Sequence, residues 1–321
     1  MIVSASRRTD IPTFYSEWFI NRIKEGFLHV RNPMNAHQVS RISLTPDVVD
    51  CIVFWTKNPI PMLPRIDELW EYCFYFQFTL TGYGKDVEAN LPDKKTKLIP
   101  AFQELSDKIG ADRVIWRYDP IVVNDRYTKE YHIKAYADIA SLLRGYTKRS
   151  VISFVDIYEK NKVNMRTLKS QEMTNPEQEK PDEDLLCFAK EFHDIAVSNG
   201  MTIATCAEKV DLSSVGIDHN SCIDKGVIES LVGGKIKAKK DPVQRPECKC
   251  VESMEVGAYN SCGNGCKYCY ANYKPESVAT NMAKYDPKST MLCDSLRPDD
   301  KITERKVKSI VDRQMSLFSD V

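Results

Sequence analysis

Three cysteines lie close together near the end of the sequence, in the stretch "CGNGCKYCY". They are Cys262, Cys266 and Cys269, and their spacing is C-x3-C-x2-C. Thiolates are soft ligands, and a close set of them selects zinc, copper(I) or an iron–sulfur cluster. A structural zinc site takes four ligands, commonly from paired C-x2-C knuckles, which this spacing does not match. Three thiolates on one short loop therefore predict a cluster with one iron open to a small molecule. A structural or electron-relay cluster and a zinc site are the alternatives.

A second set of cysteines precedes the first. The chain has 11 cysteines, and seven of them crowd residues 206–269. The four outside the motif are Cys206, Cys222, Cys248 and Cys250. Four thiolates would complete a closed [4Fe-4S] cluster or a four-cysteine zinc site. The alternative is that Cys206 and Cys222 are buried thiols and that the C-x-C pair is incidental. His219 is the rival ligand nearest in sequence.

The motif resembles the signature of radical S-adenosylmethionine (SAM) enzymes, in which an aromatic residue precedes the last cysteine. The resemblance implies that the three cysteines hold a [4Fe-4S] cluster whose fourth iron binds SAM. It also implies cleavage of SAM to a 5′-deoxyadenosyl radical, hydrogen abstraction from a substrate, and an electron donor such as flavodoxin or ferredoxin. "GAYNSCGNGCKYCYANY" is most similar to the spore photoproduct lyase branch, which suggests a nucleic-acid base or nucleotide as substrate.

The resemblance extends beyond the motif. "FWTKNPIPMLPRIDEL" (54–69), "YFQFTLTGYG" (75–84) and "VIWRYDPIV" (114–122) resemble successive strand ends of that branch. Across its whole length, from "SRRTDIP" and "FWTKNP" to the C-terminal cysteines, the chain resembles DUF1848, a bacterial family of unknown function. Two features depart from radical SAM enzymes. The cysteine loop ordinarily follows the first strand, which a circular permutation would reconcile if residues 254–260 formed a strand beside the N-terminal ones. A glycine-rich "GGE"-like segment for the SAM amino group is also not evident.

The elements that must position these groups alternate along the chain. Near-continuous apolar runs are followed by stretches with apolar residues at helical spacing, which indicates βαβ units and a parallel sheet. We predict strands over 2–6, 49–57, 74–83, 113–122, 150–158 and 201–208. We predict helices over 13–26, 61–72, 95–110, 129–145 and 183–200. The fold class is therefore α/β, with a partial (β/α)6-type parallel barrel expected and a flat doubly wound sheet as the alternative.

Charged groups follow the predicted strands, where parallel α/β folds bind their ligands. The catalytic candidates are Arg7, Arg8, Asp10, Lys57, Arg117 and Asp119. The paired arginines suit bidentate binding of the SAM carboxylate or of a substrate phosphate. The cofactor-binding candidates are Thr79, Thr81, Glu208 and Tyr268. Solvated polar turns, and a tyrosine that only packs around the cluster, are the alternative explanations.

We expect two regions: barrel repeats over 1–208 and a cysteine-rich region over 209–321 that depends on its metals for order. A long polar loop at 159–183 is either functional or disordered. The basic run 235–245 is either an exposed segment or a means of steering nucleic acid. The pentapeptide "QMSLF", Gln314 to Phe318, resembles the peptide by which bacterial replication and repair proteins engage the sliding clamp. A non-catalytic, metal-stabilised nucleic-acid-binding or clamp-associated protein is thus the alternative function.

The composition adds little about partners. Lysine and arginine number 45, aspartate and glutamate number 45, and hydrophobic residues make up 42%. The net charge of zero neither favours nor excludes nucleic acid, so only local patches bear on it. The N-terminal "MIVSASRRTD" has the wrong order of apolar and basic residues for a signal peptide, and no run approaches the length of a membrane span. We therefore expect a cytoplasmic protein without membrane contact.

Overall fold

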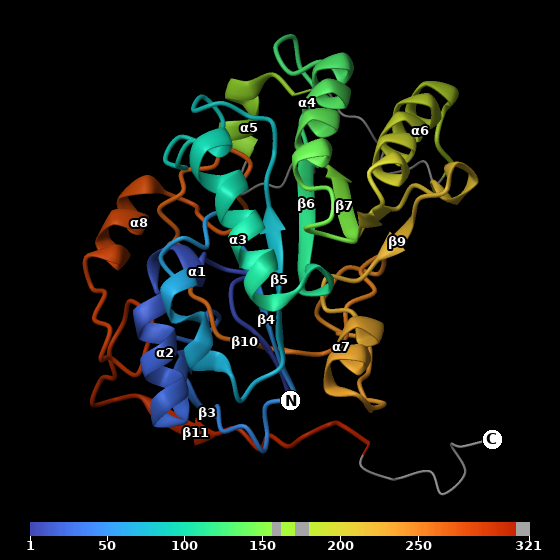
Figure 1. The fold of residues 1–321 in the computed structure, drawn as a ribbon. Coiled ribbons are helices and arrows are strands. Elements are labelled where there is room, and N and C mark those ends of the chain that lie inside the picture. Colours follow the sequence, from blue (N-terminus) through green and yellow to red (C-terminus); the bar gives the residue numbers. More distant parts are fainter. Residues whose placement is uncertain (156–161, 171–179, 313–321) are drawn as a thin grey trace, which may run out of the picture.

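The computed structural model describes residues 1–155, 162–170 and 180–312, and it is built around one eight-stranded sheet (Figure 1). Every pair of neighbouring strands in this sheet runs parallel. In spatial order the strands are β10 (Met254–Glu255), β1 (Ile2–Ser4), β4 (Cys51–Thr56), β5 (Phe74–Thr79), β6 (Val114–Ile121), β7 (Arg149–Phe154), β8 (Thr202–Cys206) and β9 (Asp218–Asn220). The α/β class and all six predicted strands are thereby confirmed.

The strand that precedes the cysteine motif lies at one edge of this sheet. β10 pairs in parallel with β1, with Met254 opposite Val3 and Glu255 opposite Ser4. The Val256 amide continues the pairing by donating to the Ser4 carbonyl at 3.0 Å. The expected strand beside the N-terminal strands is confirmed, although it is shorter than the predicted range 254–260. The cysteine loop therefore leaves the sheet at the carboxyl end of an edge strand.

One face of the sheet is covered by helices. They are α1 (Ile11–Phe14), α2 (Ser16–Glu25), α3 (Ile99–Ile109), α4 (Lys129–Leu142) and α6 (Glu183–Ser198) (Figure 1). Alternate residues of β6 point toward them, because side chains of a strand alternate between its faces. Trp116 accordingly stacks on Tyr136 of α4, with 4.6 Å between the ring centroids. Thr128 and Asp182 begin α4 and α6 as N-caps, accepting from the amides three residues on.

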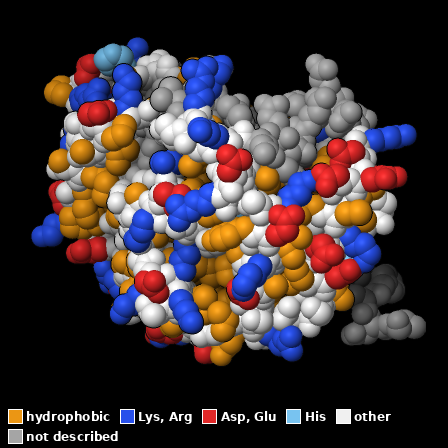
Figure 2. Space-filling model, turned by 90° about the horizontal axis from the view of Figure 1, so that it is seen from above, with side chains coloured by type: hydrophobic (Ala, Val, Ile, Leu, Met, Phe, Trp, Pro, Cys, Tyr) orange, Lys and Arg blue, Asp and Glu red, His pale blue; other side chains and the backbone are white. Residues whose placement is uncertain are grey.

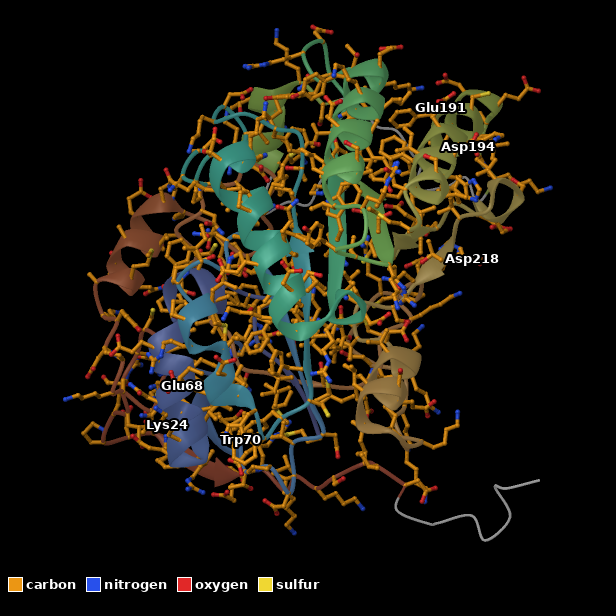
Figure 3. The ribbon with its side chains drawn as sticks, in the orientation of Figure 1. Lys24, Glu68, Trp70, Glu191, Asp194 and Asp218 are labelled. Carbon is orange, nitrogen blue, oxygen red and sulfur yellow. The ribbon has the colours of Figure 1, made fainter. Side chains whose placement is uncertain are left out.

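The segment 61–72, predicted as a helix, forms the 3-10 helix η1 (Leu63–Leu69) instead. Pro64 near its start lacks the amide proton that a longer α-helical ladder would use. Glu68 of η1 forms an ion pair with Lys24 of α2, and this pair holds η1 against that helix (Figure 3). Trp70, just after η1, is 80% exposed.

The opposite face of the sheet is covered by residues between β8 and β10, including α7 (Lys225–Val232). Tyr75, Ile115 and Val151 project from β5, β6 and β7 into a second apolar cluster. The other side of that cluster consists of Ile223, Ile228, Ile236, Val251, Cys222, Cys248 and Cys250. The sheet therefore contains strands from both sides of residue 208. We call the face of the sheet from which Tyr75, Ile115 and Val151 project its inner face, and the four-cysteine region lies against it.

Several elements were not predicted. A small sheet has the order β11 (Lys301–Glu304), β3 (Gln38–Ser43) and β2 (Phe27–Arg31). The other unpredicted elements are α5 (Lys162–Leu168), α8 (Pro275–Met282) and the 3-10 helices η3 (Ala111–Arg113) and η4 (Ser213–Val215). The helix predicted over 95–110 is present and begins with the π-helix η2 (Lys94–Leu98). Residues 159–161 and 171–179 of the predicted loop 159–183, and the peptide Gln314 to Phe318, lie outside the described residues. None of the described helices has the length and apolar character needed to cross a bilayer.

Candidate functional site

The cysteine loop is fixed to the carboxyl end of the sheet by contacts on both sides. On one side, the Tyr15 hydroxyl donates to the carbonyl of Ser261. On the other, Asn90 donates through its side chain to the Gly263 carbonyl at 2.8 Å, and the Lys267 amide donates to the carbonyl of Val87 at 3.0 Å. The segment after β5 and the start of α2 therefore hold the loop between them.

The three motif cysteines are partly buried, and their thiols resist ionisation. Burial raises the pKa of Cys262 and Cys269, and it raises that of Cys266 to about 12 although the Lys57 ammonium opposes it. Only a cation at the sulfurs would bring all three to the thiolate form that metal ligation requires. Three soft donors on one loop fit a cluster that has one position left without a protein ligand.

Glu88 is the centre of the polar network beside this loop, and it is 1% exposed. One carboxylate oxygen accepts from Lys57 Nζ at 2.9 Å and from the Tyr268 hydroxyl. The other accepts from the Thr81 hydroxyl at 2.9 Å and from Lys94. Burial works to raise the pKa of Glu88, but the two lysines outweigh it and lower the pKa to about 2. A buried carboxylate thus joins the loops after β4 and β5 to the cysteine motif.

Lys57 has a second partner in this network. Its ammonium donates to the Tyr268 hydroxyl at 2.7 Å and lies over the ring of the same residue, 5.1 Å from the centroid. Burial works to lower the pKa of Lys57, yet the Glu88 carboxylate raises it above the ordinary value. Lys57 is therefore a permanent cation next to Cys266.

Asp10 connects β1, β4 and the motif. Its carboxylate accepts from the Thr56 hydroxyl at 2.8 Å, from the Lys57 amide at 2.8 Å and from the Asn264 side chain at 3.0 Å. It also caps α1 by accepting from the amide of Thr13. Burial raises the pKa of Asp10 despite these donors. With its hydrogen bonds satisfied inside the protein, Asp10 positions the motif loop.

Arg117 and Asp119 share a face of β6, as their spacing predicts, and they form a buried pair. Arg117 Nε donates to the Asp119 carboxylate at 2.9 Å, and Nη2 donates to it as well. The remaining Asp119 oxygen accepts from the Ser153 hydroxyl. Burial works to raise the pKa of Asp119, but Arg117 lowers it, and the charge of Lys57 contributes. Charges of alternating sign thus run from Lys57, which lies next to Cys266, through Asp119 to Arg117.

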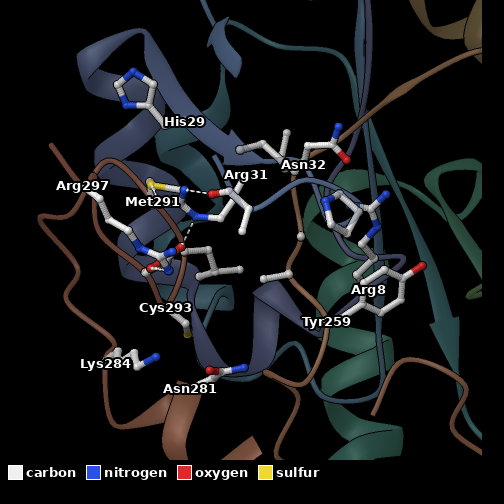
Figure 4. A pocket seen from close by; sticks show the side chains of 18 residues that line it. Arg8, His29, Arg31, Asn32, Tyr259, Asn281, Lys284, Met291, Cys293 and Arg297 are labelled. Atoms are coloured by element: carbon white, nitrogen blue, oxygen red, sulfur yellow. Dashed lines mark hydrogen bonds and ion pairs between the residues drawn. The ribbon is translucent and has the colours of Figure 1, made fainter. Parts of the chain in front are cut away.

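The two arginines after β1 lie in different surroundings. Arg7 Nη1 lies 3.3 Å from the Asp241 carboxylate, and its guanidinium lies over the Trp55 ring at 5.5 Å. Arg8 lies over the ring of Tyr259 at 5.0 Å. Arg8 and Tyr259 line a cavity of about 300 Å³, together with Lys284 and residues of β2 and of 291–297 (Figure 4). Arg8 therefore faces an open pocket, whereas Arg7 faces the four-cysteine region.

The cofactor-binding candidates are spread over the carboxyl ends of the strands. Thr79 is the last residue of β5 and pairs in register with Arg117. Thr81 and Tyr268 belong to the Glu88 network. Glu208 follows β8 and is 7% exposed, and its carboxylate accepts from the Phe154 amide at 2.8 Å. Two of the four candidates thus meet next to the motif, and Glu208 joins the ends of β7 and β8.

The four other cysteines lie close together. The sulfurs of Cys206 and Cys222 are 3.1 Å apart, and the thiol of Cys250 contacts those of Cys222 and Cys248. Among residues 1–155, 162–170 and 180–312, however, no three His, Cys, Asp or Glu side chains are placed so as to surround one metal ion. The sulfurs form a chain of contacts rather than a closed shell.

The basic run 235–245 is partly neutralised. Lys235 pairs with Glu229 and Lys237 with Asp312, each at 3.2 Å. On the face toward which the strands point, basic and acidic side chains are interspersed, without a broad area of one sign (Figure 2). The described surface therefore gives little support to electrostatic steering of nucleic acid from this face.

Sequence reasoning missed Glu88 and Lys94, which complete the network around Lys57. Both lie in polar stretches, "GKDVEAN" and "DKKTK", that are typical of exposed turns. The apolar residue directly before Glu88 that could have served as a signal is Val87, which the structure buries. The burial of Glu88 arises from contact with a loop about 180 residues later, which local patterns do not reveal.

The fold and the site define an α/β protein whose parallel sheet carries a three-cysteine loop at the carboxyl end of an edge strand. The sequence model of the family described as "Domain of unknown function (DUF1848)" matches residues 2–271, so the chain belongs to that family. The match includes all seven clustered cysteines and every strand of the large sheet. Neither the curated proteins nor the solved structures provide a match to the chain.

Proposed function

We propose that this chain is an iron–sulfur enzyme of the radical SAM type, with an open (β/α) barrel that is circularly permuted. The observation that carries the proposal is the pairing of β10 with β1. It puts the C-x3-C-x2-C loop after the first strand in spatial order, followed by β1, β4, β5, β6 and β7. In the sheet, the cysteine loop therefore follows the first strand, as it does in radical SAM enzymes, although in the sequence it comes after the other strands.

Cys262, Cys266 and Cys269 would hold a [4Fe-4S] cluster. Such a cluster with SAM at its open iron supplies a 5′-deoxyadenosyl radical for hydrogen abstraction. The fit is supported by the donor set, which is three thiols on one docked loop. It is also supported by Lys57, a buried cation whose charge favours the thiolate of Cys266.

The chain's own polar groups take positioning and binding roles in this proposal. Asp10 and Glu88 fix the loop that carries the thiols, through Asn264 and Tyr268. Arg7 would bind an anionic group of SAM or of the substrate, and Arg117, buried in its pair with Asp119, would hold the end of β6 in place. Our proposed substrate class, a nucleic-acid base or nucleotide, is supported by the likeness of "YCYA" to the photoproduct lyase branch.

The test is reductive cleavage of SAM by protein that is purified and reconstituted without oxygen. We expect 5′-deoxyadenosine to form when dithionite and SAM are added. Production should be lost in Cys269→Ala and retained in Cys187→Ala, which alters an exposed cysteine of α6. Iron-loaded wild-type protein that forms no 5′-deoxyadenosine would overturn the proposal in favour of a non-catalytic, metal-stabilised protein.

A further inference from the structure

Four cysteines from three separate segments meet on the inner face of the sheet. Cys206 ends β8, Cys222 follows β9, and Cys248 and Cys250 precede β10. The Sγ atoms of Cys206 and Cys222 lie 3.1 Å apart, and the thiol of Cys250 neighbours those of Cys222 and Cys248. Because the four thiols come from three separate segments, it is the fold, and not their spacing in the sequence, that brings them together.

Two of these sulfurs accept hydrogen bonds from N–H groups of the protein. Arg117 Nη1 donates to Cys222 Sγ at 2.9 Å, and the Ile223 amide donates to Cys250 Sγ at 3.3 Å. N–H donors to the sulfurs are the outer contacts that orient and tune metal-bound cysteines. A permanently charged guanidinium beside a sulfur favours its anionic form.

The backbone of Cys222 is held independently. Its carbonyl accepts from the Tyr75 hydroxyl at 2.7 Å and from Gln77 Nε2 at 2.9 Å, both on β5. Cys222 is therefore fixed to the sheet by three strand side chains, counting Arg117. Four thiolates around a tetrahedral metal lie ~3.8 Å apart at a metal–sulfur distance of ~2.3 Å, so Cys206 and Cys222, at 3.1 Å, would move apart on binding it.

We propose that Cys206, Cys222, Cys248 and Cys250 form a second metal centre, closed by four thiolates. The ligand chemistry is that of a soft metal, either zinc or an iron–sulfur cluster. The inference does not rest on the proposed function, because none of these cysteines belongs to the motif loop. Because four thiolates would fill all its ligand positions, this centre has no position open to a substrate. Its role would be to hold residues 206–250 against the inner face of the sheet.

The first experiment removes the motif cysteines from the full chain. We expect the variant Cys262→Ala, Cys266→Ala, Cys269→Ala, purified without oxygen, to retain one metal centre. Metal analysis distinguishes a zinc site from an iron–sulfur cluster, since a zinc site gives about one zinc atom per chain and a [4Fe-4S] cluster about four iron atoms. A folded triple variant that contains neither metal overturns the proposal.

A second set of variants assigns the centre to its ligands. Cys222→Ala in the otherwise native chain should lose the full metal content found in the triple variant and keep that of the motif. Cys187→Ala, at an exposed position of α6, is the matched control and should lose none. Loss of metal in the control alone, or in neither, contradicts the assignment.

The third measurement needs no variant and therefore does not depend on how well a variant folds. In the native protein, the four thiols should resist alkylation together and become reactive together when a chelator removes the metal. Peptide mass spectrometry reads each cysteine separately. Four unrelated alkylation rates in the native protein would refute the centre.

Discussion

Replacing Glu88 with glutamine tests whether its buried carboxylate holds the site together. The pKa of Glu88 falls from the ordinary 4.5 to about 2. At ~1.36 kcal/mol per pKa unit, this corresponds to roughly 3 kcal/mol of folding free energy at neutral pH. The residue is 1% exposed, so solvent screens little of this energy. We expect Glu88→Gln to lower the free energy of unfolding by about that amount, because Lys57 and Lys94 lose their anion.

The pH dependence supplies a signature that a general packing defect lacks. A carboxylate whose pKa is lowered on folding stabilises the protein fully above its unfolded pKa. The advantage of wild type over Glu88→Gln should therefore be constant above about pH 5 and decline as the pH falls from about 4.5 to about 2. Urea unfolding followed by circular dichroism at several pH values measures it. Glu104→Gln, at an exposed position of α3, is the control and should change stability by less than ~0.5 kcal/mol. A pH-independent difference, or a loss below ~1 kcal/mol, would refute the reasoning.

Three further changes are expected to act on the same site. Asp10→Ala should lower the free energy of unfolding by about 2 kcal/mol, because it leaves buried donors unpaired and removes a helix cap; a loss near zero in thermal unfolding would contradict this. Gly265→Ala should cost more than Gly145→Ala, since both have positive φ but only at Gly265 does a new Cβ meet another side chain, at 3.0 Å from Asn90; equal costs would show that crowding in the motif loop is unimportant. Arg117→Met should lower the free energy of unfolding by about 3 kcal/mol, because Asp119 is left buried without its cation. Arg117→Lys should recover only part of this loss, and chemical denaturation of the two variants checks the ranking.

The parallel sheet could be predicted because its strands are long apolar runs separated by helical periodicity. β10 could be located only through the resemblance of the cysteine motif, since two paired residues carry no pattern of their own. β11 was out of reach for another reason: its residues, Lys301–Glu304, are all exposed, and its pairing with β3 gives no alternation of polar and apolar residues. The 3-10 helix η1 has the apolar spacing of an α-helix, and only Pro64 indicates otherwise.

For the candidate site, the residue types were more predictable than their contacts. The spacing of Arg117 and Asp119 was enough to predict that they share a face, which the ion pair confirms. Arg7 and Arg8 are adjacent, and adjacency suggested a joint role, but neighbouring side chains diverge and their guanidinium groups have different partners. The contact of Arg117 with Cys222 joins a strand to a segment 105 residues later, and no local pattern encodes it.

The central claim is that the motif loop holds a cluster with one iron open to SAM. Electron paramagnetic resonance of the reduced, anaerobically reconstituted protein, recorded before and after addition of SAM, tests it most directly. The account predicts a [4Fe-4S] signal that changes when SAM is added and that is absent in the Cys262→Ala, Cys266→Ala, Cys269→Ala variant. A signal that SAM leaves unchanged, or zinc in place of iron at the motif, would contradict it.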